Sequence, residues 1–370
     1  MQDTLNTPSC SEGMLPVDIV LSPSWWHAHE GITFDEDFFY HPARRVEDER
    51  CMEKALHDRW GCHGLGADHD KDLPCVGAVH LASGYLIPEM LGCQIRYSDG
   101  DPPQVLPADV ESLEVPLQAA FASPAFKKLD GLLDALEVKH GYLCGDINWS
   151  GVLNVALDLR GQQLFMDFKD NPEGASHFID GISKVIHSFT QEIGRRTGTT
   201  SISVNRLAAH FKRPLLLHSE CSHTMISVDD YERFLMIYDV QWSREQRPYG
   251  IHYCGKDPHR FAESFAKLPQ LDFLDVGWGG DIALLRNHLP STFLNIRLSP
   301  LDIVHQAPDE IRAIVRRLVE DSGNPYLTGV CCINMDDTVS DAQVSAIFEE
   351  VEILRTEYES RTPGGRTFGC

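Results

Sequence analysis

The sequence lacks any long apolar run. No stretch of its 370 residues approaches the roughly 18–20 apolar residues that a membrane-spanning helix needs. The first residues, MQDTLNTPSCSEG, contain neither the basic segment nor the apolar core of a secretory signal, and the final Cys370 is not part of a prenylation motif. We therefore expect a soluble, cytoplasmic protein that has no membrane as a partner.

Positive charge is also scarce. The chain has 32 lysines and arginines against 55 aspartates and glutamates, which gives a formal net charge of −23. A field of this sign repels phosphate backbones and anionic lipid headgroups. The sequence thus argues against a nucleic-acid partner, and nothing in it defines the oligomeric state.

Cysteine, in contrast, is abundant. The 11 cysteines are scattered without regular spacing, and their number is odd. In a chain of this length without a secretory signal, such a pattern is not typical of a disulfide framework. We expect reduced thiols, most of them small buried side chains and a few of them metal ligands.

Short apolar segments alternate with amphipathic helical segments from about residue 140 onward. The strands predicted in this part are 141–147, 214–221, 249–254, 272–278, 292–299 and 327–334. An earlier strand is predicted at 17–25. This alternation is typical of a parallel sheet covered by helices. No G-x-G-x-x-G sequence leads from a strand into a helix, which weakens the case for a dinucleotide-binding fold.

We therefore predict a single α/β domain, 1–370, with the (β/α)8 TIM-barrel fold. Residues 1–140 are expected to form an N-terminal helical or irregular elaboration with the first strands, and 141–360 the main barrel. Polar residues that can bind metals follow several predicted strands. In a TIM barrel, the carboxyl ends of the strands carry the active site.

His252 and Cys254 are the clearest candidates for metal ligands. Residues two apart on a strand project from the same face, so this pair presents an imidazole and a thiolate to one point. Both ligand types suit zinc. A third ligand must come from another strand end. The candidates are the adjacent Cys331 and Cys332, of which only one can face the barrel interior, and the rival Cys221.

Two segments around this pair resemble the central region of the uroporphyrinogen decarboxylase superfamily. They are GIHYCG (250–255) and LDFLDVGWGGDIALLRNHLPSTFLNIRLSP (271–300), with support from GDINWSGVLNVALDL (145–159), SECSHTMISVDDYERFL (219–235) and GVCCINMDD (329–337). The resemblance covers about residues 140–355. The superfamily includes decarboxylases and zinc-dependent, corrinoid-linked methyltransferases.

The chain departs from the decarboxylase branch after the first strand. There the decarboxylases carry an arginine-rich motif that holds porphyrin carboxylates, whereas residues 22–36 here contain no arginine. A substrate with many carboxylates needs bidentate cations. The methyltransferase branch has a His-x-Cys motif followed by a distant Cys, and His252 and Cys254 match its first two positions.

The resemblance implies a zinc-dependent methyltransferase or demethylase. Such an enzyme transfers a methyl group between a small methylated substrate and a corrinoid (cobalamin), which we expect on a partner corrinoid protein. A methoxylated aromatic compound, a methylamine, methanol or a methylthiol would be suitable substrates. Zinc would keep a thiol deprotonated or draw charge from the heteroatom that carries the methyl group.

Other residues at strand ends are candidates for catalysis or substrate binding. Glu220 could be a metal ligand, a general acid or base, or a partner of His252, and His218 and Asp146 are the further catalytic candidates. The candidates for substrate binding are Trp25, Trp26, His29, Asn148, Trp149 and Arg297. The competing interpretations are core packing for the tryptophans, loop capping for Asp146 and Asn148, and an ion pair with Asp336 for Arg297.

Two other functions remain open at this point. One is a decarboxylase of a small carboxylated substrate on the same barrel, which would stay active after chelation. The other is a non-catalytic barrel that binds a tetrapyrrole or a partner protein, in which replacement of His252 would leave the function intact.

Overall fold

A parallel sheet lies at the centre of the molecule. The computed structural model describes residues 13–68, 73–74, 84–145, 147–198 and 213–361. Six strands form one parallel sheet in the order β1-β8-β7-β6-β5-β4. Their bounds are β1 (Val17–Leu21), β4 (Leu216–Ser219), β5 (Tyr249–His252), β6 (Phe273–Val276), β7 (Phe293–Leu298) and β8 (Thr328–Met335). A separate antiparallel pair consists of β2 (Gln94–Arg96) and β3 (Gln104–Leu106).

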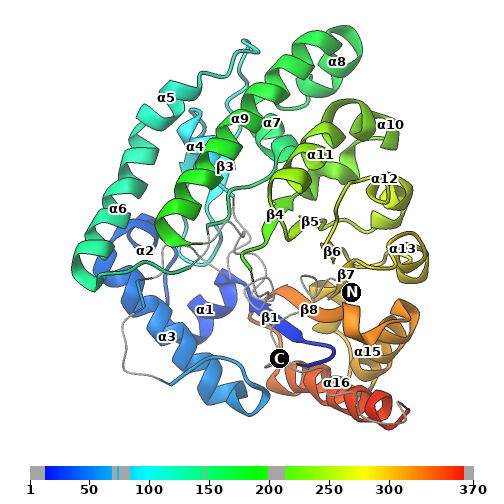
Figure 1. Ribbon diagram of the computed structural model, residues 1–370. Helices are drawn as coiled ribbons and strands as arrows, with labels where there is room; N and C mark the ends of the chain where they lie inside the picture. The colour runs from blue at the N-terminus through cyan, green and yellow to red at the C-terminus, as the bar shows by residue number, and fades with distance from the viewer. Residues whose placement is uncertain (1–12, 69–72, 75–83, 146, 199–212, 362–370) are drawn as a thin grey trace.

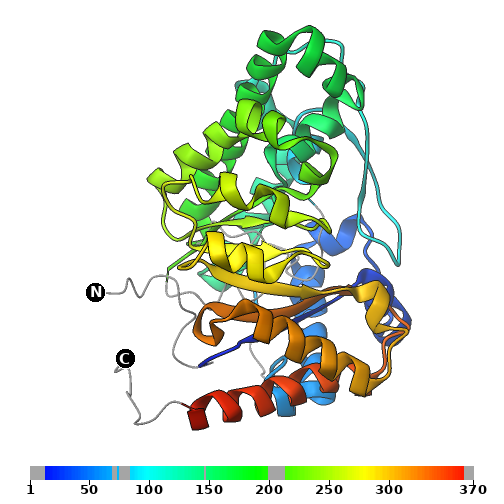
Figure 2. The ribbon, with the colours of Figure 1, turned by 90° about the vertical axis from the view of Figure 1, so that its right-hand side faces the viewer.

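Helices cover the outer side of this sheet. These helices follow one another around the strands in the order α9, α11, α12, α13, α15 and α16 (Figure 1). The view turned by 90° shows α15 and α16 outside the sheet (Figure 2). The helices up to α8 are α1 (Pro23–Glu30), α2 (Glu36–Tyr40), α3 (Pro42–Trp60), α4 (Leu86–Met90), α5 (Leu117–Ala122), α6 (Pro124–His140), α7 (Val152–Arg160) and α8 (Gln163–Asp170). The later ones are α9 (Pro172–Thr197), α10 (Val228–Asp230), α11 (Met236–Glu245), α12 (Ala262–Phe265), α13 (Ile282–His288), α14 (Pro300–Ile303), α15 (Pro308–Ser322) and α16 (Asp341–Arg361).

The two faces of the sheet differ in chemistry. Along β7, Leu294, Ile296 and Leu298 belong to the main hydrophobic core shared with the helices. Between them, Asn295 points to the other face, where its amide contacts Asp275 of β6. Because side chains alternate along a strand, the polar residues of neighbouring strands gather on the face turned away from the helices.

The parallel α/β architecture predicted from the sequence is confirmed, but a closed eight-stranded barrel is not shown. Within the described ranges the sheet is open, with β1 and β4 at its edges. The predicted strand 141–147 is wrong: among its described residues, 141–145 and 147, only Cys144 makes an isolated bridge. Gly141 ends α6 in the left-handed conformation, and Gly145 has φ of 99°, which lies outside the β region of regular strands.

The other predicted strands are present, but the one predicted over 17–25 ends at Leu21, because Pro23 begins α1. The N-terminal third is mainly helical, with α1 to α6 and the β2–β3 pair. None of the helices in the described ranges is long and apolar enough to cross a membrane.

Gly277, just after β6, packs tightly against the turn that follows β5. A Cβ on Gly277 would lie 1.8 Å from the carbonyl oxygen of Gly255, which is backbone and cannot move aside. We predict that Gly277→Ala lowers the free energy of unfolding by about 1–3 kcal/mol or more, measured by urea denaturation.

Gly131→Ala is the matched control for this substitution. Gly131 lies inside α6, and a Cβ at this position would have no neighbouring atom within 4 Å, so alanine should stabilise the helix by about 0.5–1 kcal/mol. A Gly277→Ala protein as stable as the wild type would contradict the close approach of the two turns.

Candidate metal centre

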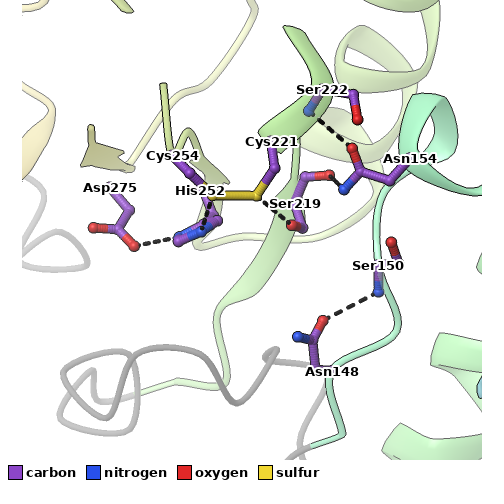
Figure 3. Close-up of a disulfide and its surroundings, with 9 residues drawn as sticks. All are labelled: Asn148, Ser150, Asn154, Ser219, Cys221, Ser222, His252, Cys254 and Asp275. Carbon is purple, nitrogen blue, oxygen red and sulfur yellow. Dashed lines mark hydrogen bonds and ion pairs between the residues drawn. A yellow bond between two sulfur atoms is a disulfide. The ribbon is translucent and has the colours of Figure 1, made fainter. Parts of the chain in front are cut away.

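Three of the predicted metal ligands meet at the carboxyl ends of β4 and β5. Cys221 lies two residues after β4 and begins the short 3-10 helix η4 (Cys221–Met225). His252 is the last residue of β5, and Cys254 lies two residues beyond it. One donor atom from each side chain lies within 4.8 Å of the others. Figure 3 shows the three side chains converging from the two strand ends.

The imidazole of His252 is held by Asp275 of β6. Its Nδ1 contacts Asp275 Oδ2, and its Nε2 lies 3.0 Å from Cys254 Sγ. The other oxygen of Asp275 accepts a hydrogen bond of 3.2 Å from the amide of Asn295. A carboxylate on one ring nitrogen selects the tautomer and directs the other nitrogen toward a metal.

The sulfurs of Cys221 and Cys254 are joined as a disulfide in this structure, with the two Cα atoms 4.9 Å apart. The sequence led us to expect reduced thiols throughout, and for this pair that expectation is wrong. The two cysteines are 33 residues apart in the chain, so only the parallel pairing of β4 with β5 brings them together. Reduction of this pair is required before both sulfurs can bind a metal as thiolates.

Side chains from two other elements hold the Cys221 turn in place. Asn154 of α7 donates to the carbonyl of Ser219 at 3.2 Å and accepts from the backbone N–H of Ser222 at 2.9 Å (Figure 3). Arg260 donates to the carbonyls of His223 and Ile226 at 2.7 and 2.8 Å. These contacts fix the backbone on both sides of Cys221.

The donor set of this cluster fits zinc. Two thiolates and one imidazole are ligands that zinc prefers, and three protein ligands leave a fourth tetrahedral position for a substrate atom. Two thiolates with a neutral imidazole also balance the charge of Zn²⁺. The carboxylate behind His252 completes the arrangement that zinc sites commonly use.

Cys331 and Cys332 are not brought into this cluster. Cys331 is buried on the polar face of the sheet, with its sulfur 3.2 Å from the Asn295 amide and 3.8 Å from Asp275. Cys332 faces the helices in the main core. Burial raises the pKa of Cys331 well above its usual value, and Asp275 adds to the rise; burial raises the pKa of Cys332 to about 12. Both thiols are therefore protonated at neutral pH.

His218 and Glu220 lie on the opposite, helix-facing side of β4. Nδ1 of His218 contacts Asp239 of α11 at 2.8 Å, and its Nε2 lies 2.9 Å from Glu220, whose other oxygen lies 2.9 Å from His223. All four side chains are buried, and Tyr231 donates to Asp239 at 2.7 Å. His218, Glu220 and Asp239 are close enough to hold a metal. However, the two acids bind opposite nitrogens of one ring, which is the geometry of an ion-paired chain.

This chain of charges sets the protonation of its members. Burial alone disfavours the charged imidazole, but Glu220 and Asp239 outweigh it and raise the pKa of His218 to about 10. Burial also opposes ionisation of Glu220, yet the two histidines hold its pKa below the usual value. At neutral pH His218 is therefore protonated and Glu220 is ionised.

The remaining predicted residues are dispersed. Trp25 and Trp26 are buried in the core, where Trp25 packs against Trp60, and Trp149 is buried against the ring of His218. His29 is exposed, with its ring 4.6 Å from that of Trp25. Asn148 accepts from the N–H of Ser150 at 3.2 Å, as a loop cap does (Figure 3). Asp146 lies outside the described residues. Core packing therefore describes the tryptophans in this structure, where the sequence suggested a substrate pocket.

Arg297 lies near the carboxyl end of β7, on the same face of the strand as Asn295. The ion pair with Asp336, the alternative to substrate binding, is not formed; the guanidinium lies over the ring of Trp278, 5.3 Å from its centroid. The sequence analysis did not identify Asn154, Arg260 or Asp239. Of these, only Asp239 could have been noticed, because it is an acid within an otherwise apolar helical segment.

We predict that His218→Leu lowers the free energy of unfolding by about 3–5 kcal/mol, because two buried carboxylates lose the cation between them. The pKa of His218 is raised on folding, so its contribution is complete below about pH 6.5 and declines as the pH rises toward 10. In urea denaturation, the difference between wild type and variant should be larger at about pH 6 than at about pH 9.

His177→Leu serves as the control, because His177 pairs with Glu114 at the surface and its loss should cost less than about 1 kcal/mol. An equal deficit of His218→Leu at both pH values would contradict a charged His218.

Comparison with known proteins identifies the fold. No family model matches the sequence, and no curated protein sequence matches it. A methyltransferase from Methanosarcina mazei aligns with a TM-score of 0.61 and 13% identity, over 96% of this chain and 97% of that chain. A B12-independent methionine synthase from Shewanella sp. W3-18-1, in complex with selenomethionine, aligns with a TM-score of 0.49 and 11% identity, over 96% and 99% of the two chains. At these identities the first alignment shows a shared fold along nearly the whole chain, and the second supports no argument of its own.

Proposed function

We propose that this chain is a zinc-dependent methyltransferase. It would transfer a methyl group between a small methylated substrate and a corrinoid carried by a partner protein. The observation that supports this most strongly is the convergence of Cys221, His252 and Cys254, with Asp275 behind the histidine. The fold is shared with a methyltransferase, and the sequence resembles zinc-dependent, corrinoid-linked methyltransferases.

The chemistry follows from the donor set. Zinc at this position would act as a Lewis acid, which lowers the pKa of a bound thiol or withdraws charge from the heteroatom of a methyl donor. Cys221 and Cys254 would supply the thiolates, and Asp275 would keep the proton on Nδ1 of His252 so that Nε2 is available. Asn295 would hold Asp275 in turn through its amide.

Glu220 and His218 take a positioning role in this proposal. Their side chains point toward the helices, whereas the metal ligands of β5 share the polar face with Asp275. Glu220 immediately precedes Cys221 and is fixed by His218 and His223. The buried ion-paired chain would therefore fix the backbone from which the Cys221 thiolate projects, without touching the reacting atoms.

Metal analysis of freshly purified, reduced protein tests the site. We expect about one zinc per chain. Cys221→Ser, His252→Ala and Cys254→Ser should each lose most of the metal, since two remaining ligands bind zinc weakly. Cys331→Ser and Cys332→Ser should retain it, because neither sulfur reaches the cluster. Loss of zinc in Cys331→Ser with retention in Cys221→Ser would overturn this ligand set.

Activity tests the reaction separately. Zinc-loaded protein would be mixed either with cob(I)alamin and a panel of methyl donors or with methylcobalamin and a panel of thiols. The formation or the consumption of methylcobalamin would be followed by absorbance. Chelation should abolish turnover and added zinc should restore it. Methyl transfer that survives complete removal of zinc would contradict the role of the metal, and no methyl transfer with any donor or thiol would instead favour the decarboxylase or binding alternatives.

A further inference from the structure

Cys221 and Cys254 occupy equivalent places on two neighbouring strands. Parallel pairing sets Ser219 opposite His252, and each cysteine lies two residues beyond its member of that pair. Their Cα atoms are 4.9 Å apart, which matches the ordinary spacing of paired strands, about 4.7–4.9 Å, and lies within the range that a disulfide spans. The sheet itself therefore holds the two sulfurs where they can bond to each other.

The turns that carry the two cysteines also pack against each other. A Cβ on Gly255, the residue after Cys254, would lie 2.0 Å from Cγ2 of Thr224 in η4. The hydrogen bonds that reach the Cys221 turn from α7 and from η6 (Pro258–Phe261) end on its backbone. Since these contacts involve neither sulfur, one backbone geometry serves both the joined and the separate sulfurs.

The same two sulfurs have two uses that exclude each other. As thiolates they are two of the three protein ligands in the cluster with His252. Once joined in a disulfide they are no longer thiolates, the form of cysteine that binds a metal. The cluster then keeps only the His252 imidazole, whose Nε2 lies 3.0 Å from Cys254 Sγ, and a single imidazole binds zinc weakly. Zinc binding and oxidation of this pair are therefore alternatives.

A soluble oxidant reaches this pair more readily than it reaches the cysteines of β8. Cys221 and Cys254 are half-buried, whereas Cys331 and Cys332 are fully buried. The six other cysteines in the described ranges, among them the two on β8, are free thiols. Adjacent residues of a strand face opposite sides, so Cys331 and Cys332 are not placed to join each other.

We propose that the Cys221–Cys254 pair is a redox switch of the metal centre, in which oxidation by hydrogen peroxide or a small disulfide releases zinc and reduction restores the site. The inference rests on the proposed function for the zinc site, but the disulfide itself requires no metal.

The oxidation balances with peroxide as the oxidant. One thiolate attacks a peroxide oxygen, the O–O bond breaks, and a sulfenic acid and a hydroxide form. The second thiolate bonds to the sulfenic sulfur and expels its oxygen as another hydroxide. Two protons from solvent convert both hydroxides into water. A small disulfide instead reacts by two exchanges and leaves as two thiolates, and a dithiol reductant reverses either reaction as it becomes a disulfide.

Zinc release from reduced, zinc-loaded, full-length protein tests the switch. Hydrogen peroxide would be added in small molar excess, the released zinc followed with a chromogenic chelator, and the disulfides mapped by mass spectrometry. We expect about one zinc released for each Cys221–Cys254 disulfide formed. Dithiothreitol followed by zinc should restore the bound metal.

Mass action provides a sharper test in a glutathione buffer. Zinc binds only the reduced pair, so free zinc above its dissociation constant opposes oxidation. Each tenfold rise in free zinc should raise by about tenfold the ratio of oxidised glutathione to the square of reduced glutathione at half-oxidation. A half-oxidation point that does not depend on free zinc would overturn the switch.

Substitutions of single cysteines provide the controls. Cys332→Ser removes a buried thiol and Cys62→Ser an exposed one, both outside the cluster, and each variant should release zinc as the wild type does. In zinc-free Cys221→Ser, Cys254 has lost its partner and should form a mixed disulfide with glutathione, detected as an added mass.

The outcomes separate the switch from the metal site. Zinc that stays bound while the exposed thiol of Cys62 is oxidised would overturn the switch and leave the metal site standing. Release of zinc without the Cys221–Cys254 disulfide would also overturn the switch alone. Protein that forms this disulfide but never binds zinc when reduced would overturn the metal site of the proposed function, and the switch with it.

Discussion

The in-register row of polar residues across the strand ends is the constraint on which the site depends. Parallel pairing places Ser219 beside His252, His252 beside Asp275, and Asp275 beside Asn295. Side chains in register point to the same face of a sheet, so this row presents an imidazole, a carboxylate and an amide in a line. The contact between His252 and Asp275 is a direct consequence of that register. A slip of one residue in β5 or β6 would turn these groups toward the helices and abolish the site.

The two faces of β4 and β5 have different roles, one structural and one chemical. On the helix-facing side, His218 pairs with both Glu220 and Asp239, and this buried ion-paired chain ties β4 to α11. On the other side, Cys221 and Cys254 approach His252.

Much of the fold and part of the candidate site could be predicted from the sequence. The apolar runs identify the strands, and alternation along one strand is enough to pair His252 with Cys254. The third ligand could not be predicted, because the choice among Cys221, Cys331 and Cys332 depends on register and on which strands are neighbours. Adjacency in sequence showed only that Cys331 and Cys332 face opposite sides. The strand expected over 141–147 failed because Gly145 adopts a positive φ, which its apolar neighbours do not reveal.

The candidate roles of buried residues were the hardest to predict. Trp25 and Trp26 are residue types that suit a substrate pocket, but both are buried in the core, where Trp25 packs against Trp60 from a different helix. Asn154 positions the Cys221 turn from α7, and no local pattern distinguishes it from an ordinary helix residue. Such long-range contacts arise from the topology, which a single sequence does not display.

X-ray absorption at the zinc edge of the reduced, zinc-loaded protein tests the central claim most directly. The account predicts two sulfur ligands at about 2.3 Å and one imidazole nitrogen at about 2.0–2.1 Å, with a light-atom ligand in the fourth position. On addition of a small thiol, that fourth ligand should be replaced by a third sulfur. Zinc bound only by oxygen and nitrogen, or by three sulfurs before any thiol is added, would contradict a centre built from Cys221, His252 and Cys254.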